Sequence, residues 1–234
     1  MGFTLIDCII PFYNEGNRIL SVVDALSRVP SINKIICVDD GSNDHASEQL
    51  KNKFPKIILV LLPKNSGKSR AVFAGLKKVT SDTVLLFDSD LVHVNPKEIE
   101  MACKKYFDTS LDMLILRANG EKRYKMMDDF FRNYIIQSGN RIIKTSDLWE
   151  VEKLHPVGYQ IEVAINQYMM DKKKHVAWCP ISTLNLHKTE KLSCIEGWKK
   201  DLAMDREIMS YLGPINRLKQ ILFFCRRKID TIRI

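Results

Sequence analysis

The sequence lacks long hydrophobic stretches and paired cysteine motifs. No apolar run approaches the roughly 18 residues needed to cross a bilayer, and no basic segment followed by a long apolar stretch marks a signal peptide. The six cysteines show no C-x-x-C spacing, and Cys8 and Cys37 lie within apolar runs. We therefore expect reduced, buried thiols rather than a disulfide framework or a zinc site. These absences favour a cytoplasmic protein that lies, at most, on the inner face of a membrane.

The composition is that of a globular domain. The chain has 234 residues, of which 45% are hydrophobic and 27% are charged, so it can bury a sizeable core. Lys and Arg total 36 against 28 Asp and Glu, a net charge of +8 that favours an anionic partner. Nucleic acid, phosphorylated substrates and acidic lipids all satisfy that requirement, so charge alone does not choose among them.

Short apolar runs alternate with segments of helical spacing through the first half of the chain. The runs expected to form strands are 5–12, 34–38, 56–62, 83–87 and 111–116, and the expected helices are 16–28, 44–53, 68–79 and 96–106. This alternation predicts an α/β fold with a mostly parallel sheet covered by helices on both faces. Beyond residue 120 the pattern changes to helices at 123–137, 160–172 and 196–211, with an extended segment at 176–186.

Polar clusters follow three of the predicted strands directly. They are Tyr13-Asn14-Glu15, Asp39-Asp40-Gly41-Ser42 and Asp88-Ser89-Asp90. Ligands bind outside the carboxyl ends of the strands in such sheets, so the three clusters should meet at one edge. Gathering carboxylates there is costly unless a cation or a ligand rich in hydrogen-bond donors is bound.

Asp88 and Asp90 are the candidate metal ligands. Two carboxylates two residues apart at the end of a strand offer hard oxygen ligands to Mg²⁺ or Mn²⁺, and phosphate oxygens would complete the shell. A nucleotide-sugar needs such a cation, because its leaving group is a nucleoside diphosphate with developing negative charge. The alternative is that this common spacing only makes a loop soluble.

The segments 39–44 and 65–68 are the next candidates. Asp39 and Asp40 can accept hydrogen bonds from a base or from ribose hydroxyls, while Ser42, Asn43 or Asp44 would cap the following helix. Lys68, at a helix start, can meet a phosphate or a ribose. A nucleotide-binding P-loop is excluded, because the position of its first glycine is occupied by Leu62.

Taken in order and at these intervals, the four motifs resemble the family-2 glycosyltransferases of GT-A fold over residues 5–95. The resemblance implies transfer of a sugar from a nucleoside-diphosphate donor such as a UDP- or GDP-hexose, usually with inversion and with Mg²⁺ or Mn²⁺. It implies that base and ribose are lined by Pro11, Tyr13, Glu15 and one of Asp39 and Asp40. It also implies that Asp88 and Asp90 hold ribose and metal.

The second half resembles the dolichyl- and polyprenyl-phosphate sugar synthases. The matching elements are Ser138-Gly139-Asn140-Arg141, Gly158-Tyr159-Gln160-Ile161-Glu162, Pro180-Ile181 and the basic segment 187–193, with Arg117 at the place of a phosphate-binding arginine. The resemblance implies a lipid-phosphate acceptor. Such a phosphate needs cations, which Arg117, Arg141, Lys188 and Lys191 could supply, and His187 is a further candidate metal ligand. The chain departs from the group at Asn140, where an aromatic residue is usual, and at His187 and Lys188, where an arginine and a glycine are usual.

The nature of the acceptor decides which residues are catalytic. A phosphate acceptor is already a nucleophile and needs cations more than a base, so Asp90, Arg117 and Arg141 are the candidates. A sugar hydroxyl would instead require a carboxylate base, for which Glu162 and Asp147 are the candidates. For Arg141 and Glu162 the alternative is an internal ion pair or surface charge, and for His187 it is an ordinary surface position.

The C-terminal stretch 214–234 combines basic and apolar residues. A basic helix with an apolar face suits the surface of an anionic membrane, although it could instead pack on the domain with a solvated basic edge. We therefore divide the chain into a GT-A domain over 1–212 and a basic amphipathic helix over 213–234. Within the domain, 1–118 would form the nucleotide-sugar-binding half and 119–212 the acceptor side.

Three other functions are consistent with the sequence. Within enzymes, the alternative is transfer to a glycan hydroxyl or a small acceptor in cell-envelope synthesis. An inactive nucleotide-sugar-binding protein is a second possibility, against which the intact Asp88 and Asp90 pair argues. A nucleic-acid binder is the third, and we expect no nucleic-acid partner because the basic stretch lacks interleaved aromatic residues for stacking.

Overall fold

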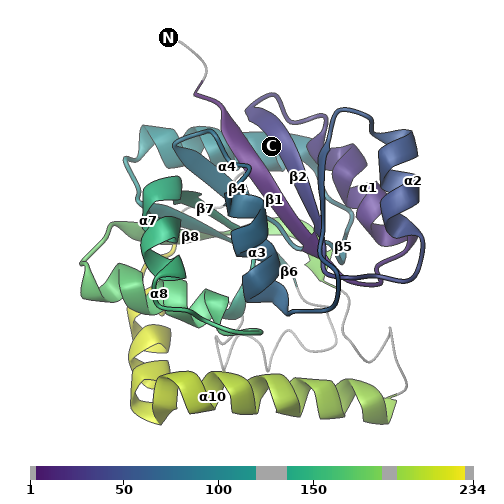
Figure 1. The fold of residues 1–234 in the computed structure, drawn as a ribbon. Helices are drawn as coiled ribbons and strands as arrows, with labels where there is room; N and C mark the ends of the chain where they lie inside the picture. Colours follow the sequence, from purple (N-terminus) through teal and green to yellow (C-terminus); the bar gives the residue numbers. More distant parts are fainter. Residues whose placement is uncertain (1–3, 120–135, 186–193, 230–234) are drawn as a thin grey trace.

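The structure is a computed structural model that describes residues 4–119, 136–185 and 194–229. It is an α/β fold built on one eight-stranded sheet (Figure 1). In chain order the elements are β1 (Ile6–Phe12), α1 (Asn17–Leu26), β2 (Ile32–Asp39), α2 (Ala46–Lys53), β3 (Ile58–Leu61), α3 (Lys68–Leu76), β4 (Thr83–Leu86), β5 (Leu91–Val92), α4 (Pro96–Asp108), β6 (Met113–Asn119), β7 (Arg141–Lys144), α7 (Thr145–Glu152), α8 (Ile161–Asp171), β8 (Val176–Asn185) and α10 (Cys194–Cys225).

The sheet has the strand order β3-β2-β1-β4-β7-β6-β8-β5. The pairs β1–β2, β2–β3, β1–β4 and β6–β8 are parallel. The pairs β4–β7, β6–β7 and β5–β8 are antiparallel. The sheet is therefore mostly parallel, as predicted, with β7 inserted in the opposite direction between β4 and β6.

The chain reverses its direction of travel across the sheet between β1 and β4. From β1 it moves outward through β2 to β3, and then returns to place β4 on the other side of β1. The pairing of β1 with β4 covers only Asp7–Ile9, so Pro11 lies beyond the last bond of that ladder and its missing N–H costs nothing there. The strands thus open at their carboxyl ends at a topological switch point, which is where ligands bind in open α/β sheets.

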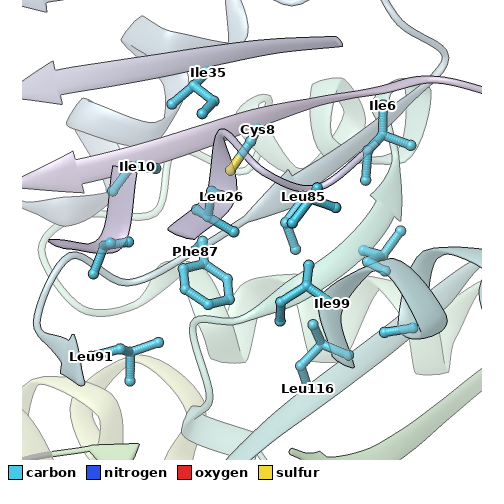
Figure 2. Packing of buried hydrophobic residues seen from close by; sticks show 14 of the residues in the cluster. Ile6, Cys8, Ile10, Leu26, Ile35, Leu85, Phe87, Leu91, Ile99 and Leu116 are labelled. Carbon is cyan, nitrogen blue, oxygen red and sulfur yellow. The ribbon is translucent and has the colours of Figure 1, made fainter. Parts of the chain in front are cut away.

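Helices cover both faces of the sheet and bury two apolar clusters. On one face α1 and α4 contribute residues such as Leu26 and Ile99, which pack with Leu85 of β4 and with Phe87, just after that strand (Figure 2). On the other face α3, α7 and α8 cover a second cluster, to which α10 adds Phe224. The all-buried pattern of β1 follows from this two-sided cover, since every side chain of the strand meets a helix layer.

The prediction of reduced, buried cysteines is confirmed for four of the five whose side chains are described. Cys8, Cys37, Cys103 and Cys179 are buried free thiols, and Cys225 is a half-buried one. Burial raises the pKa of Cys37 and of Cys103 to about 12, so these thiols stay protonated at neutral pH and behave as small apolar side chains.

The elements predicted up to residue 119 are confirmed, with ends that differ by a few residues. Two elements of the second half are missing from the prediction: the antiparallel strand β7 and the helix α7 that follows it. The predicted extended segment and the helix before it correspond to β8 and α8. The helix predicted over 123–137 lies almost entirely outside the described residues.

The C-terminal helix α10 is broken at Gly213. This glycine has a φ of 73° and a ψ of 160°, a conformation that a residue with a side chain rarely adopts, and Pro214 follows it. After α10 the chain returns to the sheet, where Trp178 N–H donates to Arg227 O and Ile229 N–H donates to Trp178 O, both at 3.0 Å. Among the residues described, no helix has the length and apolar character needed to span a membrane.

Candidate active site

The loops that follow β1 and β2 are joined by hydrogen bonds. Asn14 N–H donates to Ser42 Oγ at 2.9 Å, and Gly16 N–H donates to Asp44 Oδ2 at 2.7 Å. In return, Asn43 N–H donates to Asn14 Oδ1 at 2.9 Å. The first two polar clusters of the sequence therefore form one surface at the carboxyl edge of the sheet, as predicted.

Asp39 and Asp40 both accept hydrogen bonds within the chain. Asp40 accepts from the backbone N–H groups of Ser66 and Gly67, each at 2.8 Å, and so fixes the loop that leads into α3. Asp39 accepts from Ser42 N–H at 2.7 Å and from the Ser47 hydroxyl. Both carboxylates thus accept two hydrogen bonds within the chain, and the predicted contact of one of them with base or ribose stays a prediction.

The turn after β2 depends on Gly41, and the N-cap position of α2 is occupied by His45, which makes no side-chain cap bond, rather than by a predicted capping residue. Gly41 has a φ of +80° and packs against the backbone of Lys64, so a side chain would not fit. Of the three predicted capping residues, Asp44 accepts from Ala46 N–H at 3.2 Å. Ser42 is instead used in the contact with the loop after β1.

Lys68, Asp88 and Glu162 form an ion-pair cluster at the end of β4. The Lys68 ammonium lies 2.5 Å from Asp88 Oδ1 and 2.6 Å from Glu162 Oε1. Lys68 is the first residue of α3, Asp88 follows β4, and Glu162 lies in the first turn of α8. The prediction that Asp88 and Glu162 belong to one site is consistent with this contact, although no ligand tests their roles.

Burial and opposite charge control ionisation in this cluster. Burial opposes the charge of Lys68, but Asp88 and Glu162 together raise its pKa above the usual value, so it stays protonated. Burial also raises the pKa of Asp88, against the opposing effect of Lys68 and with help from Asp90 and Glu162. The carboxylate of Asp88 therefore requires a cation beside it to remain charged.

Gly139 and Asn140 shape the turn that carries Asp88. A Cβ atom at Gly139 would collide with the Asp88 carboxylate and the Lys68 ammonium, so only glycine leaves room for the ion pair. Asn140 Oδ1 accepts from Asp88 N–H at 2.9 Å and fixes the direction in which the strand ends. In the sequence, Asn140 was noted only because an aromatic residue is usual at that position. A polar residue there was the available signal for its hydrogen bond to the Asp88 backbone.

Arg141 is an internal residue whose guanidinium is completely buried. Its Nε donates to Ser138 O at 2.7 Å, its Nη2 to Ile136 O at 2.9 Å, and its Nη1 to Asn166 Oδ1 at 2.7 Å and Glu162 O at 3.2 Å. Burial lowers its pKa to about 10, which leaves it charged at neutral pH. Because every nitrogen donates within the chain, this arrangement forms no contact for an acceptor phosphate and supports the internal alternative.

The loop before α8 joins the site to α10. Ser69 donates to Gly158 O through its N–H at 3.0 Å and its hydroxyl at 2.9 Å. Tyr159 N–H donates to Glu207 of α10 at 2.7 Å. The Gly158-Tyr159 element recognised in the sequence is thus held between the start of α3 and the C-terminal helix.

The remaining predicted donor-site residues line the same edge. Pro11 is buried beneath the Lys68–Asp88 pair, while Tyr13 is 43% exposed and open to a ligand. Glu15 is half-buried and forms an ion pair with Arg18 at 2.8 Å. These placements bring the residues predicted for base and ribose to the switch point between β1 and β4.

The residues predicted for the acceptor are only partly described. The Arg117 guanidinium lies 5.8 Å from the centre of the Trp178 ring, on the side of the sheet that α10 covers. His187, Lys188 and Lys191 lie outside the described residues. Their predicted roles as metal and phosphate ligands stay predictions.

Asp147, considered as a base for a hydroxyl acceptor, lies near the amino end of β4, whereas Asp88 follows its carboxyl end. It belongs to α7, which follows β7, and Lys144 at the end of β7 pairs with Thr83 at the start of β4. Asp88 comes five residues after Thr83, and five residues of extended chain span roughly 16 Å. Asp147 forms an ion pair with Lys174 at 2.8 Å and lies near the other end of β4 from Asp88, a placement that does not favour its interpretation as the base.

The cluster fits a divalent cation whose remaining ligands come from the donor. Within residues 4–119, 136–185 and 194–229, no group of three or more His, Cys, Asp or Glu side chains is arranged to hold a metal. Asp88 nevertheless accommodates a cationic group at 2.5 Å, and Asp90 is two residues away. Two carboxylates, with phosphate oxygens as further ligands, match the way Mg²⁺ is commonly bound beside phosphates.

Comparison with known proteins identifies the family. The sequence model described as Glycosyl transferase family 2 matches residues 7–170, and this chain belongs to that family. The glycosyltransferase YaiP of Escherichia coli is 40% identical over 88 residues, which cover 36% of this chain and 22% of that protein. The undecaprenyl-phosphate 4-deoxy-4-formamido-L-arabinose transferase of Pectobacterium atrosepticum is 32% identical over 149 residues, which cover 60% of this chain and 43% of that protein.

Solved structures share the fold at low sequence identity. The chain is similar to glucosyl-3-phosphoglycerate synthase from Mycobacterium tuberculosis, in complex with Mn²⁺, UDP and glucosyl-3-phosphoglycerate. The TM-score is 0.70 at 18% identity, over 93% of this chain and 80% of that chain. This likeness confirms the predicted GT-A fold. By contrast, the chain spans less than half the length of the two curated relatives described above.

Proposed function

We propose that this member of glycosyl transferase family 2 transfers a hexose from a metal-bound nucleoside-diphosphate sugar to a polyprenyl or dolichyl phosphate, with inversion. The observation that carries the proposal is the cluster of Lys68, Asp88 and Glu162 at the carboxyl end of β4. It lies at the switch point of the sheet, where the loops after β1 and β2 also meet. A sugar diphosphate needs this combination of a cation-binding carboxylate and a cationic side chain.

The donor would bind across the ends of β1, β2 and β4. The exposed ring of Tyr13 would stack on the base beside Pro11, and Asp39 and Glu15 would accept hydrogen bonds from the base or ribose. Asp88 would contribute to ribose as well as metal binding. Asp40 supports these contacts by fixing the loop into α3 through Ser66 and Gly67.

Asp88 and Asp90 would hold Mg²⁺ or Mn²⁺. The cation supplies Lewis-acid neutralisation of the leaving diphosphate. The mycobacterial structure that shares the fold is a complex with Mn²⁺ and UDP, which supports this choice of cofactor. The protein's part is to orient the two carboxylates, which it does through the bond from Asp88 N–H to Asn140 and the close fit of Gly139.

The proposed acceptor is a lipid phosphate. The Pectobacterium relative is named as an undecaprenyl-phosphate sugar transferase, and the relationship covers 60% of this chain. A phosphate acceptor carries its own negative charge and needs no general base, so cationic residues would suffice. Arg117 is the described candidate for this contact, and Lys188 and Lys191 are the candidates outside the described residues.

The last turns of α10 would contact an anionic membrane. Ile215, Leu218 and Leu222 are spaced along one helical face and are 70%, 57% and 52% exposed. The segment 214–229 contains five basic residues and no acidic one. An exposed apolar face within a basic segment is the pattern that binds the surface of an anionic bilayer, where a polyprenyl phosphate would be presented.

A second candidate is transfer to the hydroxyl of a glycan or small acceptor. The structural likeness to glucosyl-3-phosphoglycerate synthase, which is also solved with phosphoglyceric acid, favours it. Such an acceptor would need Glu162 as a base. Its carboxylate is engaged by the Lys68 ammonium at 2.6 Å, so accepting a proton would cost that ion pair.

The test is release of nucleoside diphosphate from a panel of UDP- and GDP-hexoses. Reactions would contain Mn²⁺ or Mg²⁺, with and without a short-chain polyprenyl phosphate, phosphoglyceric acid or a glycan. The variant Asp90→Ala should lose turnover, whereas Asp82→Ala, an exposed carboxylate beside the opposite end of β4, should retain it. Metal-dependent release stimulated by lipid phosphate supports the proposal. Stimulation by the other acceptors alone favours the second candidate, and no turnover or nucleotide binding would refute both.

A further inference from the structure

We infer that Lys68 competes with the divalent cation for Asp88, so that the metal binds tightly only when a nucleoside diphosphate offers Lys68 another anion. The inference rests on the proposed function and deepens it, because it assigns to one side chain the coupling between donor and metal. It concerns the order of events at the site rather than the identity of the acceptor.

The geometry places the ammonium of Lys68 directly on the candidate metal ligand. It lies 2.5 Å from Asp88 Oδ1, and the side chains of Lys68 and Asp88 are only 21% and 18% exposed. Apolar residues such as Val72, Phe87 and Ile165 line the pocket around them. A charge in such surroundings is strongly unfavourable without a partner, so Asp88 keeps Lys68 until another cation replaces it.

The position of Lys68 at the start of α3 argues against a purely structural role for its positive charge. It is the first residue of the helix, where the aligned peptide dipoles favour negative rather than positive charge. The same end of a helix favours phosphate. A diphosphate bound beside α3 would therefore attract the Lys68 side chain and also occupy the position for which the helix is suited.

Charge balance links the two ligands. Asp88 is two residues from Asp90 and shares the Lys68 ammonium with Glu162, so one cation is paired with two of the three carboxylates. Adding a divalent cation without an anion would place two cationic groups on Asp88. Adding the diphosphate as well supplies a partner for Lys68 and oxygen ligands for the metal, so each ligand should increase affinity for the other by the same factor.

Metal binding measured without turnover tests this inference. Free Mn²⁺ would be followed by electron paramagnetic resonance during titration of the protein, alone and with UDP or GDP. We expect Lys68→Gln to bind Mn²⁺ alone roughly tenfold more tightly than the wild type, because one charge-assisted hydrogen bond no longer has to be broken. The enhancement of Mn²⁺ binding by nucleotide should fall correspondingly.

Two further variants serve as controls. Arg70→Gln removes a positive charge from an exposed position two residues along α3 and should change Mn²⁺ affinity less than twofold. Lys68→Arg keeps the competing charge, so Mn²⁺ alone should still bind weakly. A cooperative thermal transition would confirm that each variant is folded.

The outcomes separate this inference from the proposed function. Equal or weaker binding of Mn²⁺ alone by Lys68→Gln overturns the inference, as does a tenfold gain in Lys68→Arg or Arg70→Gln. If Lys68→Gln does not fold, the Lys68→Arg result decides. Failure of the wild type to bind Mn²⁺ even with nucleotide would instead remove the proposed metal site.

Discussion

Replacing Arg141 distinguishes an internal role from a role in binding the acceptor. Its buried guanidinium donates to the backbone oxygens of Ile136, Ser138 and Glu162 and to the Asn166 side chain. Arg141→Met keeps a long apolar side chain but removes the guanidinium donor from these four oxygens, of which Ile136 O keeps a second side-chain donor, from Asn166. We therefore expect a loss of fold stability rather than only a loss of acceptor affinity.

The magnitude follows from the burial of the charged group. Leaving a buried acceptor without its donor costs about 1–3 kcal/mol, and because several acceptors lose the same donor we expect a total of about 3–5 kcal/mol. For a chain of this length each kcal/mol lowers the midpoint of thermal unfolding by roughly 2–4 °C, so the expected decrease is roughly 6–20 °C. Arg141→Lys should recover only part of it, because one ammonium group cannot reach oxygens arranged around a planar guanidinium.

Thermal unfolding measured beside donor hydrolysis and acceptor titration would test the prediction. Lys144→Met, an exposed basic residue at the other end of β7, provides a matched control that should lose much less stability. The reasoning would be refuted if Arg141→Met unfolded at the wild-type temperature while its KM for a polyprenyl phosphate rose. That result would assign Arg141 to the acceptor phosphate.

Three further predictions address the turn, the sheet and the C-terminal helix. Gly139→Ala should weaken nucleotide-dependent Mn²⁺ binding by roughly tenfold or more, because its methyl group displaces the Asp88 ion pair; unchanged binding in a titration would contradict the contact. Hydrogen bonds outweigh burial to lower the pKa of Asp7, so its contribution to stability is present above pH 3.8 and is lost as pH falls through the lower, folded-state pKa. Urea unfolding should show Asp7→Asn less stable by about 1–3 kcal/mol at pH 7, with the difference shrinking in acid. Leu218→Glu should reduce flotation with anionic vesicles whereas Leu154→Glu, at another exposed position, should not; equal effects would argue against a specific membrane-facing surface.

The fold of the first half could be predicted because local patterns agree with the tertiary structure. Strands such as β1 are apolar at nearly every position, which is what two-sided burial requires, and polar residues begin where each strand ends. Those polar residues also mark the site, because all parallel strands of this half end at the same edge. In this half of the chain the residues that end the strands are therefore also the candidate site residues.

The second half could not be predicted equally well because its elements depend on distant partners. The strand β7 has only four residues and begins with Arg141, a residue type that is rarely buried. Its place in the sheet comes from antiparallel pairing with β4 and β6. In both pairings the partner residues are more than 20 positions away in the sequence. Sequence reasoning left Arg141 open between a functional role and an internal ion pair or surface charge, because Asn166, its partner on α8, gives no local signal.

Lys68 shows the same limit at the site itself. Its position before a helix indicated contact with a ligand, and that expectation is still untested. Its partners Asp88 and Glu162 follow elements far apart in sequence, so no spacing rule connects the three residues. Each carboxylate was identified separately, and only the structure reveals that a single ammonium joins them.

The two faces of the C-terminal helix have different surroundings. Gln220 is completely buried, donates to Val163 O at 3.0 Å and accepts from Asn166, which in turn accepts from Arg141. Arg141 donates to the backbone of Glu162, so the helix supports the ion-pair cluster through consecutive buried hydrogen bonds. The opposite face exposes apolar side chains such as Leu218. Under the proposed function, a helix that packs beside the ion-pair cluster with one face and presents apolar residues with the other would hold the site at a fixed distance from a membrane carrying the proposed lipid acceptor.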